Sequence, residues 1–220
     1  MEVIYEDNHI IVVNKKAGEI VQGDKTGDTP LSEMVKEYLK EKYNKPGNVF
    51  CGVTHRIDRP VSGLVVFAKT SKALERLNRM FREGKVHKRY RALVEGFPEE
   101  KATLRNYLKS DGRMNKTFIT TPEDKDGKES LLEYSTVKRG DRYTMLDINL
   151  LTGRKHQIRA QLSGIGHPIK GDLKYGAKRS NPDGGISLVA YQIEFIHPVS
   201  GAEIKLQAEL PEEFQKILKG

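Results

Sequence analysis

The stretch at residues 131–151 constrains the fold more than any other part of the chain. Its sequence, LLEYSTVKRGDRYTMLDINLL, has two runs rich in β-branched and aromatic residues on either side of Gly140 and Asp141. Two such runs joined by a short glycine-containing turn predict a tight β-hairpin. Because a hairpin joins antiparallel neighbours, this stretch favours an antiparallel sheet over a parallel one.

Short apolar runs bounded by turn residues predict further strands along the chain. They lie at residues 3–7, 9–15, 64–69, 88–96, 103–109, 187–198 and 203–210. The first two flank Asp7 and Asn8, a turn-favouring pair, so the chain is expected to open with a hairpin. The strands outnumber the helical segments, and most are too close together in sequence for long crossovers.

Apolar residues at three- and four-residue steps predict helices. These stretches lie at residues 31–43, 71–84 and 152–166, and a short helix is expected at the C-terminus. Ser71 is the expected cap of the second helix and Gly84 its stop. In the third, Ile158, Leu162 and Ile165 fall on one face. The predicted fold class is therefore α+β, a mostly antiparallel central sheet with flanking helices and loops.

Composition limits the class of protein. Apolar residues make up 37% of the chain and charged residues 31%, a globular balance that predicts folding without a partner. The net charge of +8 favours a polyanionic partner, although a merely soluble basic protein explains it equally well. No repeat or linker is visible, so a single domain over residues 1–220 is expected.

Cysteine usage and the N-terminus bear on the compartment. Cys51 is the only cysteine, which excludes an intrachain disulfide, and no CxxC pair suggests a zinc site. The first residues, MEVIYEDNHIIVVNKK, lack the apolar core of a signal peptide, and no run is long enough to span a bilayer. We expect a cytoplasmic protein with no membrane association and no metal.

Asp58 is the first candidate for chemistry. It lies between Arg56 and Arg59, whose cations favour the charged carboxylate. An anion suits nucleophilic or electrostatic work but not a general acid. The same residues also fit a surface aspartate in a turn, which Pro60 and Gly63 favour.

The segment TGRKHQIR at residues 152–159 is the second candidate. If Thr152 caps a helix here, Arg154 and Lys155 lie in its first turn beside free backbone N–H groups, a combination that attracts phosphate or carboxylate. Arg159 falls one turn beyond Lys155, on the same side. Basic residues run against the usual preference for acidic ones at this position, which indicates a ligand or a partner carboxylate. A solvated basic face explains the pattern equally well.

Tyr90, in KRYRALVEG, is the third candidate. Strand alternation places it on one face with Ala92 and Val94. A tyrosine there is either a core residue or a surface on which an RNA base stacks.

Other segments give weaker signals. The glycine-rich stretch at 166–176, with Asp172 and Tyr175, fits a turn scaffold better than catalysis. The basic turn at 109–116 fits either a phosphate contact or ordinary solvation. His55 fits a hydrogen-bonded structural residue better than an acid or base.

Taken together, these segments resemble the RluA-type pseudouridine synthases. HRIDRPVSGLVVFAK resembles the catalytic motif of that family, commonly HRLDxxTSG; KRYRALVEG resembles its tyrosine motif, and LLTGRKHQIRAQL followed by GHPIKGDLKYG its third. The order agrees, and the resemblance extends from VIYEDNHIIVVNK to EFIHPVSG. The family isomerises uridine to pseudouridine in RNA without a cofactor: it breaks the N1–C1′ bond, turns the base and rejoins it through C5.

The resemblance implies roles for the matching residues. Asp58 would be the catalytic carboxylate, which attacks C1′ of the sugar, attacks C6 of the ring, or takes a sugar proton. Arg159 would pair with Asp58 and hold it charged and oriented, while Tyr90 would stack on the uracil. Arg56 would fill the gap left by the flipped base, and Ile158 would line the base pocket.

The resemblance also bears on partners. Arg154 and Lys155 would belong to a basic surface that grips the phosphates beside the flipped uridine. The substrate would be ribosomal or transfer RNA, and a monomer is the family default. Many relatives carry a small N-terminal RNA-binding domain, whereas this chain begins close to its catalytic motifs. Substrate grip is therefore expected from the catalytic domain or from a partner.

The departures from the family pattern are modest. Ile57 replaces the usual Leu, Val61 stands where Thr is common, and Lys16 where relatives tend to have Pro. None removes a reacting group, but Val61 lacks a hydroxyl that could brace the loop.

Two rival functions follow from the same residues. One is an RNA-binding module that has lost the chemistry, which would have no need of Asp58, Tyr90 and Arg159 together. The other is a hydrolase that breaks a glycosidic bond, which usually needs a second carboxylate. Asp172 is the clearest other carboxylate in the motif segments, and the sequence favours a structural role for it.

Overall fold

The chain divides into two compact units. The computed structural model describes residues 1–219. The first unit comprises Met1–Val86 and Gln192–Ala208, and the second comprises His87–Tyr191 and the chain from residue 209 on. Strand β10, Leu188–Ile196, begins in the second unit and ends in the first. The expectation of a single domain over residues 1–220 stays a prediction.

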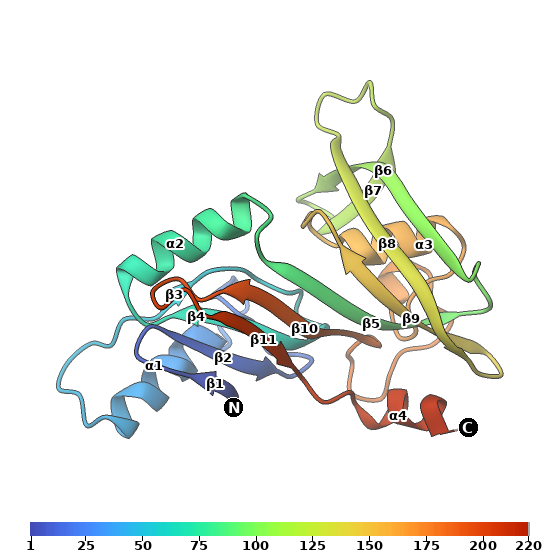
Figure 1. Ribbon diagram of the computed structural model, residues 1–220. Helices are drawn as coiled ribbons and strands as arrows, with labels where there is room; N and C mark the ends of the chain where they lie inside the picture. Colours follow the sequence, from blue (N-terminus) through green and yellow to red (C-terminus); the bar gives the residue numbers. More distant parts are fainter. Residues whose placement is uncertain (220) are drawn as a thin grey trace. The chain divides into compact units, whose positions relative to one another are not determined.

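Four antiparallel strand pairs belong to the first unit: β1–β2, β2–β4, β3–β4 and β10–β11. Its strand order is β1, β2, β4 and β10, with β3 on β4 and β11 on β10 (Figure 1). The bounds are β1 Glu2–Glu6, β2 Ile10–Lys15, β3 Gly52–Val53, β4 Ser62–Ala68 and β11 Glu203–Gln207. Ile10 and Ile11 of β2 are both fully buried, although adjacent strand residues point to opposite faces. The sheet of this unit is therefore covered on both sides.

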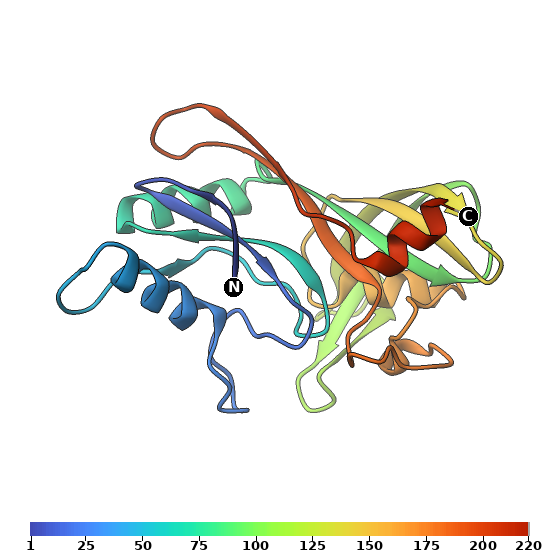
Figure 2. The same cartoon turned by 90° about the horizontal axis from the view of Figure 1, so that it is seen from below.

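Two helices provide that cover. Figures 1 and 2 show α1, Leu31–Lys42, and α2, Ser71–Arg82, on opposite sides of the strands. Ala73 and Leu77 of α2 pack into a cluster that includes Val66 of β4. Both helices confirm the sequence prediction, since their apolar residues recur at helical spacing.

The start of α2 differs from the prediction by one residue. Thr70, not Ser71, is the N-cap: its backbone is extended and its hydroxyl accepts a hydrogen bond from the N–H of Ala73, at 3.2 Å. The cap must lie just outside the helix for its side chain to reach that N–H, and Ser71 is already helical.

The second unit contains the antiparallel pairs β5–β9, β8–β9, β6–β8 and β6–β7. Its strand order is β10, β5, β9, β8, β6 and β7 (Figure 1). The bounds are β5 His87–Glu95, β6 Lys101–Asp111, β7 Lys116–Thr120, β8 Lys128–Arg139 and β9 Tyr143–Leu150. The predicted hairpin of β8 and β9 is confirmed, and the N–H of Gly140 donates to the carbonyl of Tyr143 at 2.9 Å. The short strands β3 and β7 were not predicted.

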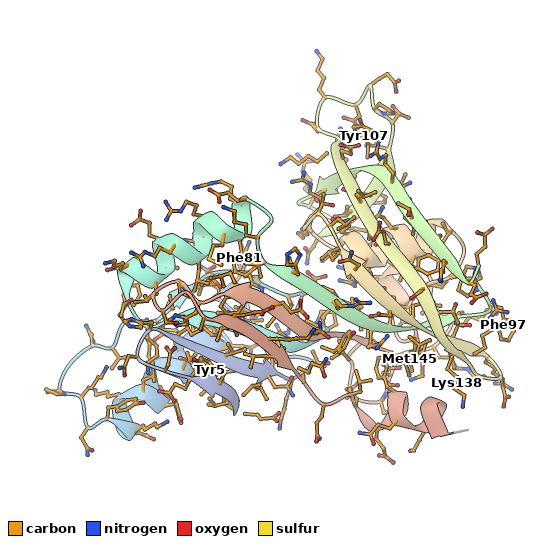
Figure 3. All side chains as sticks on the ribbon, in the orientation of Figure 1. Tyr5, Phe81, Phe97, Tyr107, Lys138 and Met145 are labelled. Carbon is orange, nitrogen blue, oxygen red and sulfur yellow. The ribbon has the colours of Figure 1, made fainter. Side chains whose placement is uncertain are left out.

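Short helices complete the second unit. They are α3, Gln157–Gly164, the 3₁₀ turn η1, Leu173–Tyr175, and α4, Glu212–Lys219. Phe214 of α4 lies in a buried cluster with Leu93 and Met145, the latter labelled in Figure 3. None of the helices within residues 1–219 is both long and apolar enough to cross a membrane. The α+β class and the mostly antiparallel sheet are thus confirmed.

The cap of α2 gives a stability prediction. Thr70→Ala should lower the free energy of unfolding by about 1 kcal/mol, because the N–H of Ala73 loses its acceptor. Ser71→Ala is the matched control and should leave that free energy unchanged. Urea unfolding of the two variants provides the measurement, and an equal loss in both would contradict the assignment of the cap.

Candidate active site

Asp58 lies in the turn between β3 and β4 of the first unit. Its side chain is half-buried, whereas the neighbouring Ile57 is buried and Arg56 is exposed. The N–H of Val61 donates to the carbonyl of Asp58 at 3.0 Å, which closes the turn. Arg59, which follows Asp58, pairs its guanidinium with the exposed carboxylate of Asp28.

A buried lysine fixes the backbone that follows Asp58. The ammonium of Lys15 donates to the carbonyls of Val61 (2.7 Å), Lys16 (2.9 Å) and Arg59 (3.1 Å), and the residue is only 1% exposed. Burial lowers the pKa of Lys15 to about 8, and the nearby carboxylates of Glu19 and Asp58 oppose that shift. The aspartate turn is thus tied to the end of β2. This role of Lys15 was not predicted from the sequence, although a lysine that ends the apolar run IIVVN was the available signal.

His55 has a structural role in the same segment, as the sequence favoured. Its Nε2 accepts a hydrogen bond from the N–H of Val66 at 3.1 Å, and its ring lies 4.7 Å from that of Phe81. The loop bracing placed in doubt by Val61 is supplied by its backbone groups, which bond to Asp58 and Lys15.

Tyr90 lies on β5 in the second unit. It pairs in register with Ile148 of β9, and Ala92 pairs with Leu146, so the predicted alternation is confirmed. Tyr90 is buried, 6% exposed. Its ring is therefore held on a paired strand rather than on a loop.

Lys88 shares this face of β5, two residues before Tyr90. Burial lowers the pKa of its amine. A Cβ added at Gly153 would lie 3.5 Å from Nζ of Lys88, so the amine lies next to the TGRK segment, residues 152–155. Sequence reasoning did not single out Lys88, because one more lysine in a basic run carries no distinguishing signal.

The segment TGRK, residues 152–155, is not helical, contrary to the prediction. The predicted helix over 152–166 begins only at Gln157, because His156 before it is left-handed, with φ 50°. Thr152 does not cap it: its hydroxyl donates to Oε1 of Gln157 at 2.8 Å. Arg154 and Lys155 therefore lie outside the helix as exposed turn residues, and the expected anion site at a helix N-terminus is wrong.

The same correction applies to the neighbours of these residues. Lys155 is not helical, so Arg159 does not share a helix face with it. Arg154 donates from Nε to the carbonyl of Glu129 at 3.1 Å. Ile158 is buried in the first turn of α3, as predicted, whereas Ile165 follows the helix end and is exposed.

Arg159 lies on α3 and pairs with Asp172. Its Nε donates to one carboxylate oxygen at 2.7 Å and its Nη2 to the other at 2.9 Å. Both side chains are buried, 6% and 1% exposed. The centre of the guanidinium also lies 4.9 Å from the ring centroid of Tyr175. Sequence reasoning gave Asp172 and Tyr175 only a turn role, because thirteen residues separate Asp172 from its partner.

A second buried carboxylate is also held by arginine. Asp147 of β9 pairs with Arg89 and with Arg91, the latter at 3.2 Å, and accepts a hydrogen bond from the hydroxyl of Tyr191 at 3.1 Å. Arg91 lies 4.5 Å from the ring centroid of Tyr191. Because Asp147 and Asp172 both accept hydrogen bonds from arginine, neither is arranged as the proton donor that a glycosidic hydrolase requires.

The predicted site residues thus occupy defined positions in each unit. Arg56 and Asp58 belong to the first unit, and Tyr90, Ile158 and Arg159 to the second. Within the described residues 1–219, no group of three or more His, Cys, Asp or Glu side chains is arranged to hold a metal ion.

Comparisons with known proteins agree on one family. The family model described as RNA pseudouridylate synthase matches residues 9–164. The chain is 31% identical to ribosomal large subunit pseudouridine synthase D of Zymomonas mobilis, over 100% of this chain and 72% of that protein. It is 28% identical to tRNA pseudouridine synthase C of Vibrio parahaemolyticus, over 99% of this chain and 93% of that protein.

A solved structure shows the same fold. Human RNA Pseudouridylate Synthase Domain Containing 4 superimposes with a TM-score of 0.82 at 20% sequence identity, covering 99% of this chain and 92% of that one. At that identity, the likeness concerns the fold alone.

The role of Lys15 can be tested directly. At pH 7 its amine is charged, because its pKa of about 8 lies above that pH. Lys15→Met keeps the volume but leaves the loop carbonyls without their donor. Turnover should fall by roughly 10²-fold, the effect of misplacing a reacting group by about 1 Å.

The Lys15→Met variant should also be less stable than the wild type. Unfolding free energy should fall by roughly 2 kcal/mol, the scale of buried unsatisfied acceptors. Lys16→Met, at an exposed position, is the control and should change neither quantity. Normal turnover in Lys15→Met would show that the loop does not depend on this amine.

Proposed function

The chain belongs to the RNA pseudouridylate synthase family, and we propose that it modifies a uridine of ribosomal or transfer RNA with Asp58 as the catalytic carboxylate. Enzymes of this family convert uridine to pseudouridine in RNA, so the chain is an isomerase. The observation that carries the proposal is the extent of the family match. Its span, residues 9–164, includes Asp58, Tyr90 and Arg159.

The substrate class rests on relatives and on charge. Relatives at similar identity are named for ribosomal RNA in one case and for transfer RNA in another. The net charge of +8 suits either polyanion, because displacing counterions from phosphates favours binding. Arg154 and Lys155 are exposed cations that would contact phosphates beside the target nucleotide.

Asp58 acts in this proposal as an anion. Its turn is fixed by Lys15, so little conformational entropy remains to be lost when the carboxylate meets the nucleotide. The proposal assigns Arg159, whose Nε and Nη2 bind Asp172, the further task of keeping Asp58 charged and oriented during the reaction. Tyr90 stacks on the uracil, and its place on a paired strand gives the base a rigid surface.

The target uridine must leave its stack to reach this carboxylate. Extrusion costs a few kcal/mol in unstacking and unpairing. Arg56 is exposed beside Asp58, where its side chain fills the gap left by the base and offsets part of that cost. Ile158 lines the base pocket with an apolar side chain.

The reaction balances without a redox partner. The N1–C1′ bond breaks, a C5–C1′ bond forms, the C5 proton leaves and N1 takes up a proton. We place the enzyme in the cytoplasm as a monomer and treat residues 1–220 as one catalytic domain that needs neither metal nor cofactor.

A tritium-release assay tests the proposed activity. RNA labelled with tritium at C5 of uridine should release tritium to water in the presence of the protein, because C5 exchanges its proton for the bond to C1′. No free uracil should form. Free uracil would instead indicate a hydrolase, and neither product on any cellular RNA would indicate an RNA-binding module.

The role of Asp58 needs its own variant. Asp58→Asn should reduce turnover by roughly 10³-fold or more, the scale for removing a reacting group. RNA affinity, measured by filter binding, should stay within a few-fold, because the amide keeps the size of the carboxylate. Asp141→Asn, in the exposed β8–β9 turn, is the control and should retain full turnover. Retained turnover in Asp58→Asn would remove Asp58 from the reaction.

A further inference from the structure

The ion pair with Asp172 fixes the orientation of the guanidinium plane of Arg159 and also compensates its charge. Two parallel hydrogen bonds, at 2.7 and 2.9 Å, join Nε and Nη2 to the two carboxylate oxygens. A bidentate pair of this kind defines the orientation of the guanidinium, which a single contact does not. The Nη1 nitrogen takes no part in this pair.

Tyr175 covers the same guanidinium and is itself fixed. Its ring centroid lies 4.9 Å from the centre of the Arg159 guanidinium. Its hydroxyl accepts a hydrogen bond from the N–H of Thr117 at 2.8 Å and lies 2.9 Å from Nδ1 of His156. Burial raises the pKa of Tyr175, so the phenol stays protonated. The ring therefore cannot swing away without breaking contacts to β7 and to the turn before α3.

The loop that carries Asp172 and Tyr175 is anchored to the rest of the second unit. The N–H of Lys170 donates to the carbonyl of Leu93 on β5 at 2.8 Å, and Oγ of Ser163 on α3 donates to the carbonyl of Tyr175 at 2.6 Å. Gly171 is left-handed, with φ 89°, and an added Cβ would lie 2.8 Å from Asn181. The loop thus connects the strand of Tyr90 to the helix of Arg159.

Stability alone is a weak reason for this arrangement. A buried ion pair costs desolvation energy, and apolar residues of similar volume often stabilise a protein as well or better. A buried arginine with its own carboxylate and aromatic cover is therefore better explained by a need for a guanidinium in one orientation.

We infer that Asp172 and Tyr175 are positioning residues, which hold the guanidinium of Arg159 in the orientation that the isomerisation requires. The inference rests on the proposed function, in which Arg159 orients Asp58. It assigns the GDLKY segment a part in the reaction beyond that of a turn. Neither residue needs to touch the RNA.

A double-mutant cycle tests whether Asp172 acts through Arg159. Asp172→Asn should lower kcat by about 10²-fold, as a misplaced group does, with KM within a few-fold. In an Arg159→Met background, the same substitution should lower kcat no further. Multiplicative losses in the double variant would mean that Asp172 acts independently and would overturn the inference.

Conservative variants at the same two positions extend the test. Asp172→Glu retains the charge and should recover part of the rate lost in Asp172→Asn. Tyr175→Phe keeps the ring but loses the hydroxyl contacts, and it should lower kcat several-fold at constant KM. Tyr107→Phe is the control: by strand alternation, Tyr107 faces away from Leu108, which packs with Tyr175. Wild-type kcat in Tyr175→Phe would remove Tyr175 from the assignment.

A spectroscopic measurement separates this inference from the proposed function. In ¹H–¹⁵N NMR spectra, Nε–H of Arg159 should exchange slowly in the wild type and rapidly in Asp172→Asn. Equal exchange in both would overturn the positioning role. A wild-type protein that releases no tritium from any RNA would instead refute the proposed function, whatever the exchange rates show.

Discussion

A buried cation loses its hydration energy and must regain it through hydrogen bonds to protein acceptors. This constraint determines the structure around one buried cation in each unit. Lys15 meets it with backbone carbonyls of the aspartate turn, and Arg159 meets it with Asp172. Because every donor needs a placed acceptor, the surrounding backbone has little freedom. The backbone beside Asp58 and the side chain of Arg159 are therefore held in place before RNA binds.

Burial divides the basic residues into two kinds of use. Arg56, Arg154 and Lys155 are exposed and suit a mobile, salt-dependent grip on phosphate. Lys15 and Arg159 are buried and organise their neighbours instead. An enzyme that must seize a polyanion and also hold one carboxylate in a defined orientation needs both kinds. The net charge of the chain does not distinguish exposed basic residues from buried ones.

Local sequence patterns predicted much of the fold. The runs around Gly140 gave the β8–β9 hairpin, and helical spacing gave α1 and α2, because neighbouring residues alone decide these features. Asp58, Tyr90 and Arg159 were proposed as site residues from ordered motifs that resemble those of the family. The helix assigned from Thr152 failed because a left-handed His156 and the hydrogen bonds of Gln157 hold the preceding residues as a turn.

The sequence by itself determined the α+β class, the strand alternation around Tyr90 and the motifs that identify the family. Each of these is carried by residues close together in the chain. Only the tertiary structure decided that Lys15 holds the turn of Asp58, and that Asp172 and Tyr175 enclose Arg159. These contacts join residues far apart in sequence. Such pairs form only when a complete fold removes both partners from water, and no local pattern encodes that event.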